Sequence, residues 1–591
     1  MFNKKTNKNN EVNYNNVSRS RPKNYKEKKK PVRQNNKWLR GNNNELRFFG
    51  LGGLRSFMFS CYVYEYNGKF IIVDYGIGGF GGSDMHTDFD TNEFVDLSFF
   101  KGKEHLVEGL FVTHNHADHS DALIYLHKTL RCPVFATPIV KKALENECQL
   151  AKLNFKRIIN FNTISPKGNT TNTKNFSVTG VSISHSIPES LMFHIETKAG
   201  AVLHTGDFKF SKNSLAGENT NTKYLKSLKS KKLLAIIGES TDVLSQWKRG
   251  KTELDVAQCL TKLFSSTKKR IVLTRYARAV NRINAIEIAA YKSNRKIVLI
   301  GLSINQYYDI ANELGYLKYK NLVISREEAE DYHDSELVYC LSGTQGEQFS
   351  GLQRTIFQPN RNDIQLSAGR DLVLFSSRVI PGNDTRIASM YEELIDKGIE
   401  FKTYHLDNNL HTGGHDISHI ELIDFYKTVN PATFIPMHGT LMHMIVNKML
   451  ADKAGIRHTI LPHNGDVVAL SHNKAPRIIA SVPTDTIVQT KHFTMSKKDI
   501  ASVSIDKKFS ATMFISIARS SKDSIMVTDN GPLALVPNSK VDIELAIKPL
   551  IKKFNDNDLI ENIKLVVRQL IQNKLSKGFK FIYNINIHII K

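Results

Sequence analysis

Four potential metal ligands stand within six residues of this chain, directly after an apolar run that is typical of a β-strand. The segment is Val112-Thr-His114-Asn-His116-Ala-Asp118-His119, an H-x-H-x-D-H pattern. A strand that runs into a tight loop projects alternate side chains toward one point, so His114 and His116 would face one metal ion, and Asp118 and His119 a second. Imidazole nitrogen and carboxylate oxygen are the donors that zinc takes without thiolate. The alternative, a chance histidine-rich loop, fits this specific pattern poorly.

Further residues of ligand type follow other apolar runs. His185 comes after an expected strand, Asp207 ends the segment His204-Thr-Gly-Asp207, and His438 ends the run Phe434-Ile-Pro-Met-His438. The C-terminal ends of strands are where α/β sheets usually build their sites. Asp74, at the end of the run Ile71–Asp74, is predicted to orient a metal-bound histidine from behind.

The composition narrows the kind of partner. The formal net charge is +24, which favours polyanions because each Lys or Arg near a phosphate releases condensed counterions. A general preference for lysine would give the same charge, so charge alone does not decide for nucleic acid. The five cysteines are odd in number and widely spaced, which argues against a disulfide framework or a cysteine zinc site. No apolar stretch approaches a membrane span and no secretory signal is evident, so we expect a cytoplasmic protein without a membrane partner.

The first 42 residues differ from the rest of the chain. The first 40 contain 13 Lys or Arg and 2 Asp or Glu, a net of +11 by subtraction, with ten Asn and almost no apolar residues. Such a segment buries too little surface to offset its ordering entropy, so we predict a disordered tail over residues 1–42. It is either an arm that grips RNA or a solvated tail with no specific role.

Interleaved strands and helices predict an α/β protein from residue 43 onward. Expected strands include 59–66, 70–74, 110–113, 178–184, 192–197 and 201–204, with a helix over 121–130. Short apolar runs at 233–238, 271–273, 297–300, 337–340 and 372–375, with helices over 279–291 and 306–313, predict a second domain with a largely parallel sheet. We place a linker near 470–480 and a small α+β domain after it, with a helix over 558–575 and a strand over 579–590.

Together the residues named above resemble those of the metallo-β-lactamase superfamily. The resemblance implies an αββα sandwich with two zinc ions at one edge. It implies that His114, His116 and His185 hold one zinc, that Asp118, His119 and His438 hold the other, and that Asp207 bridges them. Two zinc ions would supply a nucleophile at neutral pH and a Lewis acid for a phosphoryl oxygen. Manganese also accepts oxygen and nitrogen donors, so it stays an alternative to zinc.

Within that superfamily, three features resemble the nuclease branch that carries an inserted β-CASP domain. About 230 residues separate Asp207 from His438, which leaves room for an inserted domain. The segments Glu239-Ser240-Thr241 and His411-Thr412-Gly413-Gly414-His415 resemble two β-CASP motifs. Other segments resemble the ribonuclease J family: 185–190, 204–210, 343–347 and 378–383. The expected domains are a sandwich in two parts, 43–230 and 386–468, a β-CASP domain over 231–385, and a C-terminal domain over 480–591 that would serve oligomerisation.

The resemblance also implies an activity. Ribonuclease J enzymes digest RNA from the 5′ end, prefer a 5′ monophosphate, can cut internally, act in RNA processing and decay, and form homodimers or homotetramers. His415 would donate a proton to the leaving 3′ oxygen. The glycines would let backbone amides approach a phosphate. The expected catalytic residues are His415, Asp207 and Asp74, and the expected substrate contacts are His411, Thr412, Gly413, Gly414, His415, Tyr276, Ala277, Arg278, Glu239 and Ser240.

Three positions depart from the family's pattern. Asn115 and Asp416 stand where glycine is usual, and the loop Thr274–Arg278 differs from the family's sequence. These changes spare every metal ligand but put recognition of the 5′ end in doubt. Two alternatives therefore stay open: a weakly active ribonuclease J paralogue that mainly partners another subunit, and a β-CASP nuclease that acts on DNA.

Overall fold

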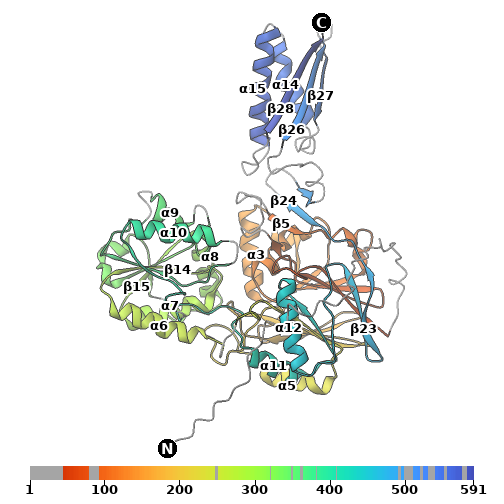
Figure 1. The fold of residues 1–591 in the computed structure, drawn as a ribbon, viewed down its shortest axis with the longest axis vertical. Coiled ribbons are helices and arrows are strands. Elements are labelled where there is room, and N and C mark those ends of the chain that lie inside the picture. Colours follow the sequence, from red (N-terminus) through yellow and green to blue (C-terminus); the bar gives the residue numbers. More distant parts are fainter. Residues whose placement is uncertain are drawn as a thin grey trace, which may run out of the picture.

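The computed structural model describes residues 44–78, 92–245, 250–319, 321–347, 350–359, 364–380, 383–407, 409–489 and 494–497, and toward the C-terminus residues 510–518, 524–529, 539–551, 556–574 and 582–590. In these residues the chain forms a sandwich of two sheets, a second α/β domain beside it, drawn in green, and a blue module at the C-terminal end (Figure 1). The predicted basic tail over 1–42 lies outside the described residues.

Two mixed sheets form the sandwich. The first has the strand order β23-β22-β1-β2-β3-β6-β7-β8 and the second has the order β21-β20-β13-β12-β11-β10-β9. The first sheet comprises β1 (Leu46–Gly52), β2 (Cys61–Tyr66), β3 (Lys69–Val73), β6 (Val107–Phe111), β7 (Pro133–Ala136), β8 (Asn160–Thr163), β22 (Asp466–Ser471) and β23 (Lys474–Ser481). The second comprises β9 (Thr170–Asn172), β10 (Ser177–Ser182), β11 (Leu191–Thr197), β12 (Gly200–His204), β13 (Ala235–Glu239), β20 (Thr433–Met437) and β21 (His458–Thr459).

Both faces of these sheets are buried. Along β3, Ile71 and Val73 belong to the core between the sheets, whereas Phe70 and Ile72 belong to the core outside the first sheet. Successive side chains of a strand point to opposite faces, so a sheet covered on both sides has continuous apolar runs. The first sheet is covered by α1 (Ala117–Ser120), α2 (Leu123–Leu126), α3 (Pro138–Leu150) and α4 (Phe155–Ile158), and the second by α5 (Thr222–Ser227), α11 (His419–Val429) and α12 (Leu441–Lys453). The expected αββα sandwich is confirmed.

The second domain contains a parallel sheet, as predicted. Its strand order is β16-β15-β17-β14-β18-β19, and neighbouring strands in this order run parallel. The strands are β14 (Arg270–Thr274), β15 (Lys296–Ile300), β16 (Val323–Ile324), β17 (Leu337–Leu341), β18 (Asp371–Phe375) and β19 (Glu400–Lys402). Helices α6 (Glu253–Ser266) and α7 (Val280–Lys292) pack on one face, and α9 (Gly351–Phe357) and α10 (Asp384–Asp396) on the other, while α8 (Leu302–Glu313) faces the sandwich. We call this the inserted domain.

The boundaries expected for the inserted domain, 231 and 385, are wrong at both ends. Strand β13, which the sequence pattern assigns to the parallel sheet, pairs instead with β12 and β20 in the sandwich. Strand β19 pairs with β18, so the inserted domain runs from α6 to β19, over residues 253–402. A short apolar run has the same composition in either sheet, and only its partners decide where it belongs.

The C-terminal part also begins later than expected. Strand β23 lies where we predict a linker near 470–480 and completes the first sheet. Strand β24 (Thr486–Gln489) then pairs with β5 (Asn92–Val95), in a small sheet with β4 (Ile77–Gly78) and β25 (Thr494–Ser496). The α+β module comprises β26 (Ser510–Ala518), β27 (Ser524–Asp529), α14 (Ser539–Ile551), α15 (Asp556–Lys574) and β28 (Ile582–Ile590). Its own core includes Ile515, Ile547 and Ile563.

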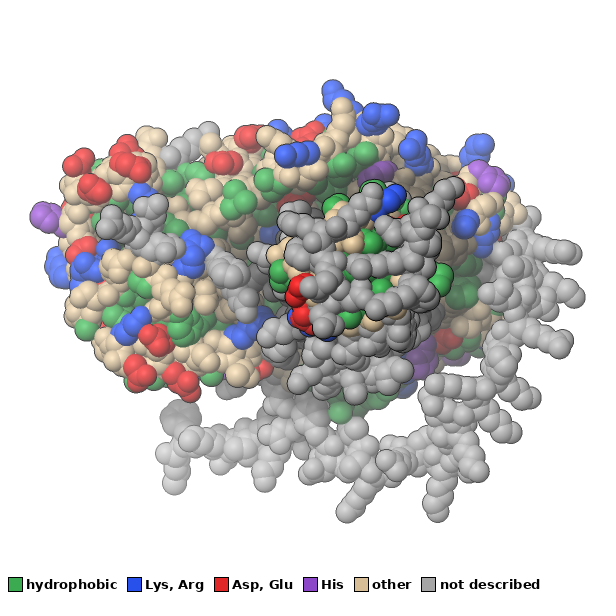
Figure 2. All heavy atoms as spheres, turned by 90° about the horizontal axis from the view of Figure 1, so that it is seen from above, with side chains coloured by type: hydrophobic (Ala, Val, Ile, Leu, Met, Phe, Trp, Pro, Cys, Tyr) green, Lys and Arg blue, Asp and Glu red, His purple; other side chains and the backbone are tan. Residues whose placement is uncertain are grey.

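The segment after the His-rich loop is not the single helix expected over 121–130. Within that range only α2 is α-helical, and the preceding four-residue helix α1 contains the ligand candidates Asp118 and His119. Within the part of the chain that the structure describes, no helix has both the length and the apolar character needed to cross a bilayer. Viewed from above, acidic and basic side chains alternate over the inserted domain, and basic ones prevail along the upper right edge (Figure 2).

Candidate metal centre

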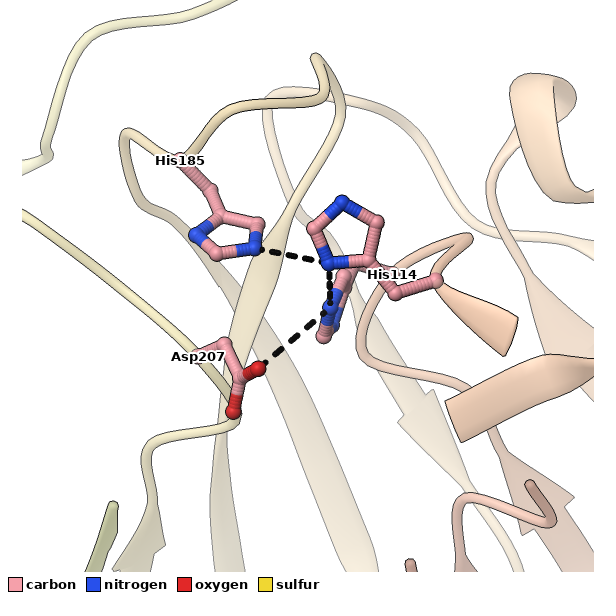
Figure 3. Close-up of side chains that lie close together, drawn as sticks. His114, His185 and Asp207 are labelled. Atoms are coloured by element: carbon pink, nitrogen blue, oxygen red, sulfur yellow. Dashed lines mark hydrogen bonds and ion pairs between the residues drawn. The ribbon is translucent and has the colours of Figure 1, made fainter. Parts of the chain in front are cut away.

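Three histidines and one carboxylate converge at one edge of the sandwich. Nδ1 of His116 lies 3.0 Å from Nε2 of His114 and 3.0 Å from Nε2 of His185. Asp207 completes the group, with Oδ2 3.8 Å from Nε2 of His114. Figure 3 shows His114, His185 and Asp207 pointing toward one another from separate loops. Burial lowers the pKa of His116 to about 3, so its ring is neutral at pH 7 and offers a lone pair to a cation.

A second group lies beside the first and is richer in carboxylates. Nε2 of His438 lies 3.0 Å from Oδ2 of Asp118 and 3.2 Å from Nε2 of His119. Nε2 of His119 is also 3.2 Å from Oδ2 of Asp207, so Asp207 stands between the two groups. Burial opposes protonation of His119, but Asp207, Asp118 and Asp74 outweigh it and raise its pKa well above the usual value. This pocket therefore attracts positive charge.

Metal binding fits the donor atoms present. Each group brings one ligand atom per residue to within 4.8 Å of the others. Oδ1 of Asp207 is buried without a hydrogen-bond donor among the described residues. A buried carboxylate oxygen is costly unless a donor or a cation satisfies it, and a divalent cation held by nitrogen and oxygen does so.

Asp74 holds His119 from behind, as predicted. Its Oδ2 lies 2.8 Å from Nδ1 of His119, and its Oδ1 accepts the backbone N–H of Thr113 at 2.7 Å. Asp74 and His438 both have a left-handed backbone, with φ of 64° and 50°. Such a conformation costs a residue with a side chain about 1–3 kcal/mol and is commonly found at functional sites. The turn with Asp74 and the turn with the candidate ligand His438 thus both carry backbone strain.

His415 faces the same centre from the turn between β19 and α11. Its Nε2 lies 3.7 Å from Oδ2 of Asp207, and its Nδ1 lies 2.7 Å from Oε2 of Glu239. Burial lowers the pKa of His415, but the carboxylates of Glu239 and Asp207 outweigh this effect and raise it to about 9. The ring therefore carries a proton at neutral pH, with 22% of its side chain still exposed.

Glu239 and Ser240, which are expected from the sequence to contact substrate, lie inside the protein. Glu239 is 4% exposed and accepts the backbone N–H of Phe208 at 2.5 Å, besides contacting His415. Ser240 is fully buried, and its Oγ accepts a hydrogen bond from Asn447 of α12. Because both side chains are buried, they are not placed to contact the substrate directly. Glu239 positions His415, and Ser240 packs β13 against α12.

The turn over residues 411–416 is held by charged side chains. Arg282 of α7 donates to the carbonyl of Thr412 at 3.0 Å and lies 3.4 Å from Nδ1 of His411. Lys209 donates to the carbonyl of Gly413 at 3.0 Å. A side chain on Gly414 would meet the His185 ring at 2.2 Å, so glycine is required for this close approach. The turn therefore joins the inserted domain to the metal centre.

Arg278 and Asn115 connect the two domains. The Arg278 guanidinium donates to Oδ1 of Asp121 at 2.8 Å and to the carbonyl of Asn115 at 3.1 Å. The Asn115 side chain accepts a hydrogen bond from the Tyr307 hydroxyl at 2.8 Å. Asn115 thus serves as a docking point for α8. In the same loop as Arg278, the ring of Tyr276 lies edge-on to His116, with centroids 5.8 Å apart.

Three residues at the centre have no individual role in the sequence-based prediction, although Thr241 belongs to one of its motifs. Thr113 binds Asp74, the Thr241 hydroxyl lies 2.9 Å from Nδ1 of His438, and the Ser186 hydroxyl lies 3.1 Å from Nε2 of His116. Each stands next to, or within three residues of, a residue that the motifs do identify. A hydroxyl within that distance of a motif residue is the signal that could have indicated them.

Two family models match the parts that build this centre. The model described as "Beta-lactamase superfamily domain" matches residues 99–221, which include every ligand candidate except His438. The model described as "Ribonuclease J, beta-CASP domain" matches residues 268–394, within the inserted domain.

The similarity of this chain to known proteins extends over both domains. The chain is 30% identical over 435 residues to "Ribonuclease J" of Mycolicibacterium smegmatis, covering 73% of this chain and 75% of that protein. The chain belongs to the ribonuclease J family. It is also 29% identical over 435 residues to "Ribonuclease J" of Sinorhizobium meliloti, covering 73% of this chain and 75% of that protein. With "Ribonuclease J" of Corynebacterium glutamicum it is 30% identical over 449 residues, but these span 75% of this chain and only 60% of that relative.

As a ribonuclease J family member, the chain combines a metallo-β-lactamase sandwich with an inserted β-CASP domain. The superfamily implies binding of divalent metal, and the two groups of His and Asp side chains described above fit such ions.

Proposed function

We propose that this chain hydrolyses phosphodiester bonds of RNA. The observation that carries the proposal is the juxtaposition of two metal-ligand groups, with the carboxylate of Asp207 between them and with His415, whose pKa is raised to about 9, facing that carboxylate. Hydrolysis of a phosphodiester requires an activated nucleophile, neutralisation of the phosphoryl charge and a proton for the leaving oxygen. Membership of the ribonuclease J family supports RNA as the substrate.

We infer that the centre binds two zinc ions. His114, His116 and His185 would hold one ion, Asp118, His119 and His438 the other, and Asp207 would bridge them. When bound, the ions supply Lewis acidity toward a phosphoryl oxygen and a nucleophile at neutral pH. Manganese is the alternative that the same donors accept.

The chain's own residues prepare the proton transfer. Glu239 fixes the His415 ring through Nδ1, so that Nε2 faces the shared carboxylate of Asp207. A proton held at Nε2 is available to the leaving 3′ oxygen of the cleaved bond. Asp74 and Thr241 orient the rings of His119 and His438. Such partners keep the reacting groups in place before substrate arrives.

The finer features expected from the family stay proposals. These are digestion from the 5′ end with internal cleavage as a second mode, assembly into a homodimer or homotetramer through the C-terminal module, and a cytoplasmic location. Contacts of His411, Thr412, Gly413, Gly414, Tyr276, Ala277 and Arg278 with RNA also belong here, although Arg278 and Thr412 already have partners within the protein.

The test uses one RNA sequence with a 3′ label, beside DNA of the same sequence. Purified protein should degrade the RNA, and His116→Ala should remove both metal and cleavage. His472→Ala, at an exposed histidine outside the centre, is the matched control. Cleavage of DNA in preference to RNA would favour the DNA-nuclease alternative. Bound zinc without any cleavage would contradict the proposal and favour a partner-subunit role.

A further inference from the structure

A carboxylate of the protein itself lies in an anion-binding cradle beside the metal centre. Oδ2 of Asp416 accepts the backbone N–H of Gly413 at 3.0 Å and lies 2.9 Å from the Thr412 hydroxyl. Oδ1 of Asp416 forms an ion pair with the guanidinium of Arg378. A backbone amide, a hydroxyl and a guanidinium are the donors that proteins commonly present to phosphate groups. We call these three donors, from Gly413, Thr412 and Arg378, the cradle.

Cations surround this carboxylate on more than one side. Lys209 is 3% exposed, and its ammonium group donates to the carbonyl of Gly413. Asp242 also contacts Arg378, with 3.2 Å between Oδ1 and Nη1. Without Asp416, this cluster of charged side chains would have one buried negative charge fewer. The cradle would then attract an anion from outside the protein.

The cradle and the metal centre share one turn of the chain. The position of a Cβ on Gly413 lies 2.9 Å from Oδ1 of Asp416, whereas that on Gly414 lies against the ring of His185. Nδ1 of His185 is 3.0 Å from the carbonyl of Gly414. Gly413 of the cradle and Gly414 beside His185 are consecutive residues, and consecutive Cα atoms are about 3.8 Å apart. An anion in the cradle would therefore lie close to a bond that is cut at the metal centre. A terminal phosphate of the substrate is an anion of this kind.

Asp416 is buried and tied to the donors that such a phosphate would need. Only 2% of its surface is exposed. Because it belongs to the same turn, the carboxylate competes with a free phosphate as an intramolecular ligand at high effective concentration. It also repels a second anion that approaches the same place.

We propose that Asp416 is a built-in anion that fills this cradle, so that the chain does not select RNA by a 5′-terminal phosphate. This inference rests on the proposed function and concerns its specificity. Asp416 is then a specificity-determining residue, and the substrates include RNA ends without a phosphate. Arg378 and Lys209 serve to hold the turn rather than the end of the RNA.

The first test compares RNA with a 5′ monophosphate and the same RNA with a 5′ hydroxyl. The wild-type kcat/KM for the two should agree within about twofold, whereas one charge-assisted contact to the phosphate would separate them by about tenfold or more. A wild-type preference of about tenfold for the phosphate would overturn the proposal. Absence of any cleavage would instead count against the proposed function.

Two variants test the role of the carboxylate. Asp416→Ala empties the cradle, so the ratio of kcat/KM for phosphorylated over hydroxyl RNA should rise by about tenfold. Asp416→Asn removes the charge but still fills the space, so its ratio should rise by less than that of Asp416→Ala. Asp424→Ala, at an exposed aspartate on α11, is the matched control. An unchanged ratio in folded Asp416→Ala, as judged by its melting curve, would contradict the proposal.

A binding measurement gives a readout that needs no cleavage. Isothermal titration of the metal-loaded protein with uridine 5′-monophosphate and with uridine should show a gain of affinity for the monophosphate in Asp416→Ala only. Equal affinity of wild type and Asp416→Ala for the monophosphate would overturn the proposal even if no RNA is cut. If Asp416→Ala fails to fold, the ratio of kcat/KM for phosphorylated over hydroxyl RNA in the wild type and in Asp416→Asn still tests the proposal.

Discussion

His116 and His415 have the same side chain, and the proposed function gives them opposite roles at the centre. Burial among other histidines lowers the pKa of His116 to about 3 and leaves it a neutral ligand. Burial also opposes protonation of His415, but Glu239 and Asp207 raise its pKa to about 9 and keep it a proton donor. Two titratable groups whose environments move their pKa values apart divide the tasks of ligand and acid.

Replacement of His415 tests this division. His415→Ala should lower kcat by about 100-fold or more, the usual contribution of a positioned acid, while the bound metal stays. The measurement is steady-state RNA hydrolysis together with the metal content of the purified variant, with His472→Ala as control. If kcat fell less than about threefold with metal retained, another group would have to supply the proton.

Asp74 contacts His119 and is proposed to act on the metal through it, so its removal should affect metal affinity first. In Asp74→Asn an amide replaces the carboxylate that binds both His119 and Thr113. We expect metal affinity to fall by about 10–100-fold, as for other partners of ligating histidines. Competition with a chelator measures this directly, and Asp424→Asn is the control. Unchanged metal affinity in Asp74→Asn would mean that Asp74 only stabilises the strained turn.

At the scale of elements, the loops that end the strands carry the centre, and the inserted domain fixes them. The loop after β6 brings the His-rich segment, and the loop after β14 brings Arg278 onto it. Helix α8 adds Tyr307 on Asn115, and the start of α7 adds Asn281, whose amide donates to the carbonyl of His185 at 3.2 Å. Contacts between domains therefore converge on the metal-binding loops.

The Arg278–Asp121 pair is expected to couple the domains energetically. Arg278→Ala and Asp121→Ala should each lower kcat/KM, and the double variant should be reduced about as much as one single variant. The coupling from this cycle should be about 1–3 kcal/mol, the range for residues in one network. RNA hydrolysis by all four proteins gives the value. If the effects of the two single variants on kcat/KM simply added in the double variant, the Arg278–Asp121 pair would not couple the inserted domain to the metal centre.

At the scale of the whole molecule, charge is distributed unevenly along the chain. The net charge is +24, and the first 40 residues hold +11 of it. Over the inserted domain, by contrast, basic and acidic side chains alternate on the face shown in Figure 2. Long-range attraction of RNA should therefore depend strongly on the N-terminal segment, while cleavage depends on the centre.

Deletion of residues 2–42 tests this separation. RNA affinity should fall and its salt dependence should flatten, by about 0.7 in the slope of log K against log salt for each phosphate that the segment neutralises. The kcat at saturating RNA should not change. Binding titrations at several salt concentrations measure the slope, and a variant with Gln for the Lys and Arg of the segment separates charge from length. An unchanged slope in both would contradict a role in binding.

The sequence by itself indicated the candidate metal ligands, because metal binding depends on particular residue types at short spacing. His114 to His119 lie in one loop, and His185, Asp207 and His438 each follow an apolar strand. The ends of these strands, which come from both sheets, meet at one edge of the sandwich. The α/β pattern, the parallel sheet of the inserted domain and the α+β end were predicted from apolar periodicity, whereas the αββα sandwich was implied by the resemblance to the metallo-β-lactamase superfamily.

Only the tertiary structure decided which residues outside those motifs act together. Asp416 and Arg378 are 38 residues apart, and Asn115 and Tyr307 are 192 apart, so no local pattern joins them. The place of β13 in the sandwich and the burial of Ser240 also depended on partners distant in sequence. Such pairings are set by packing between elements, which periodicity does not encode. For the same reason, the filling of the cradle by Asp416 became visible only in three dimensions.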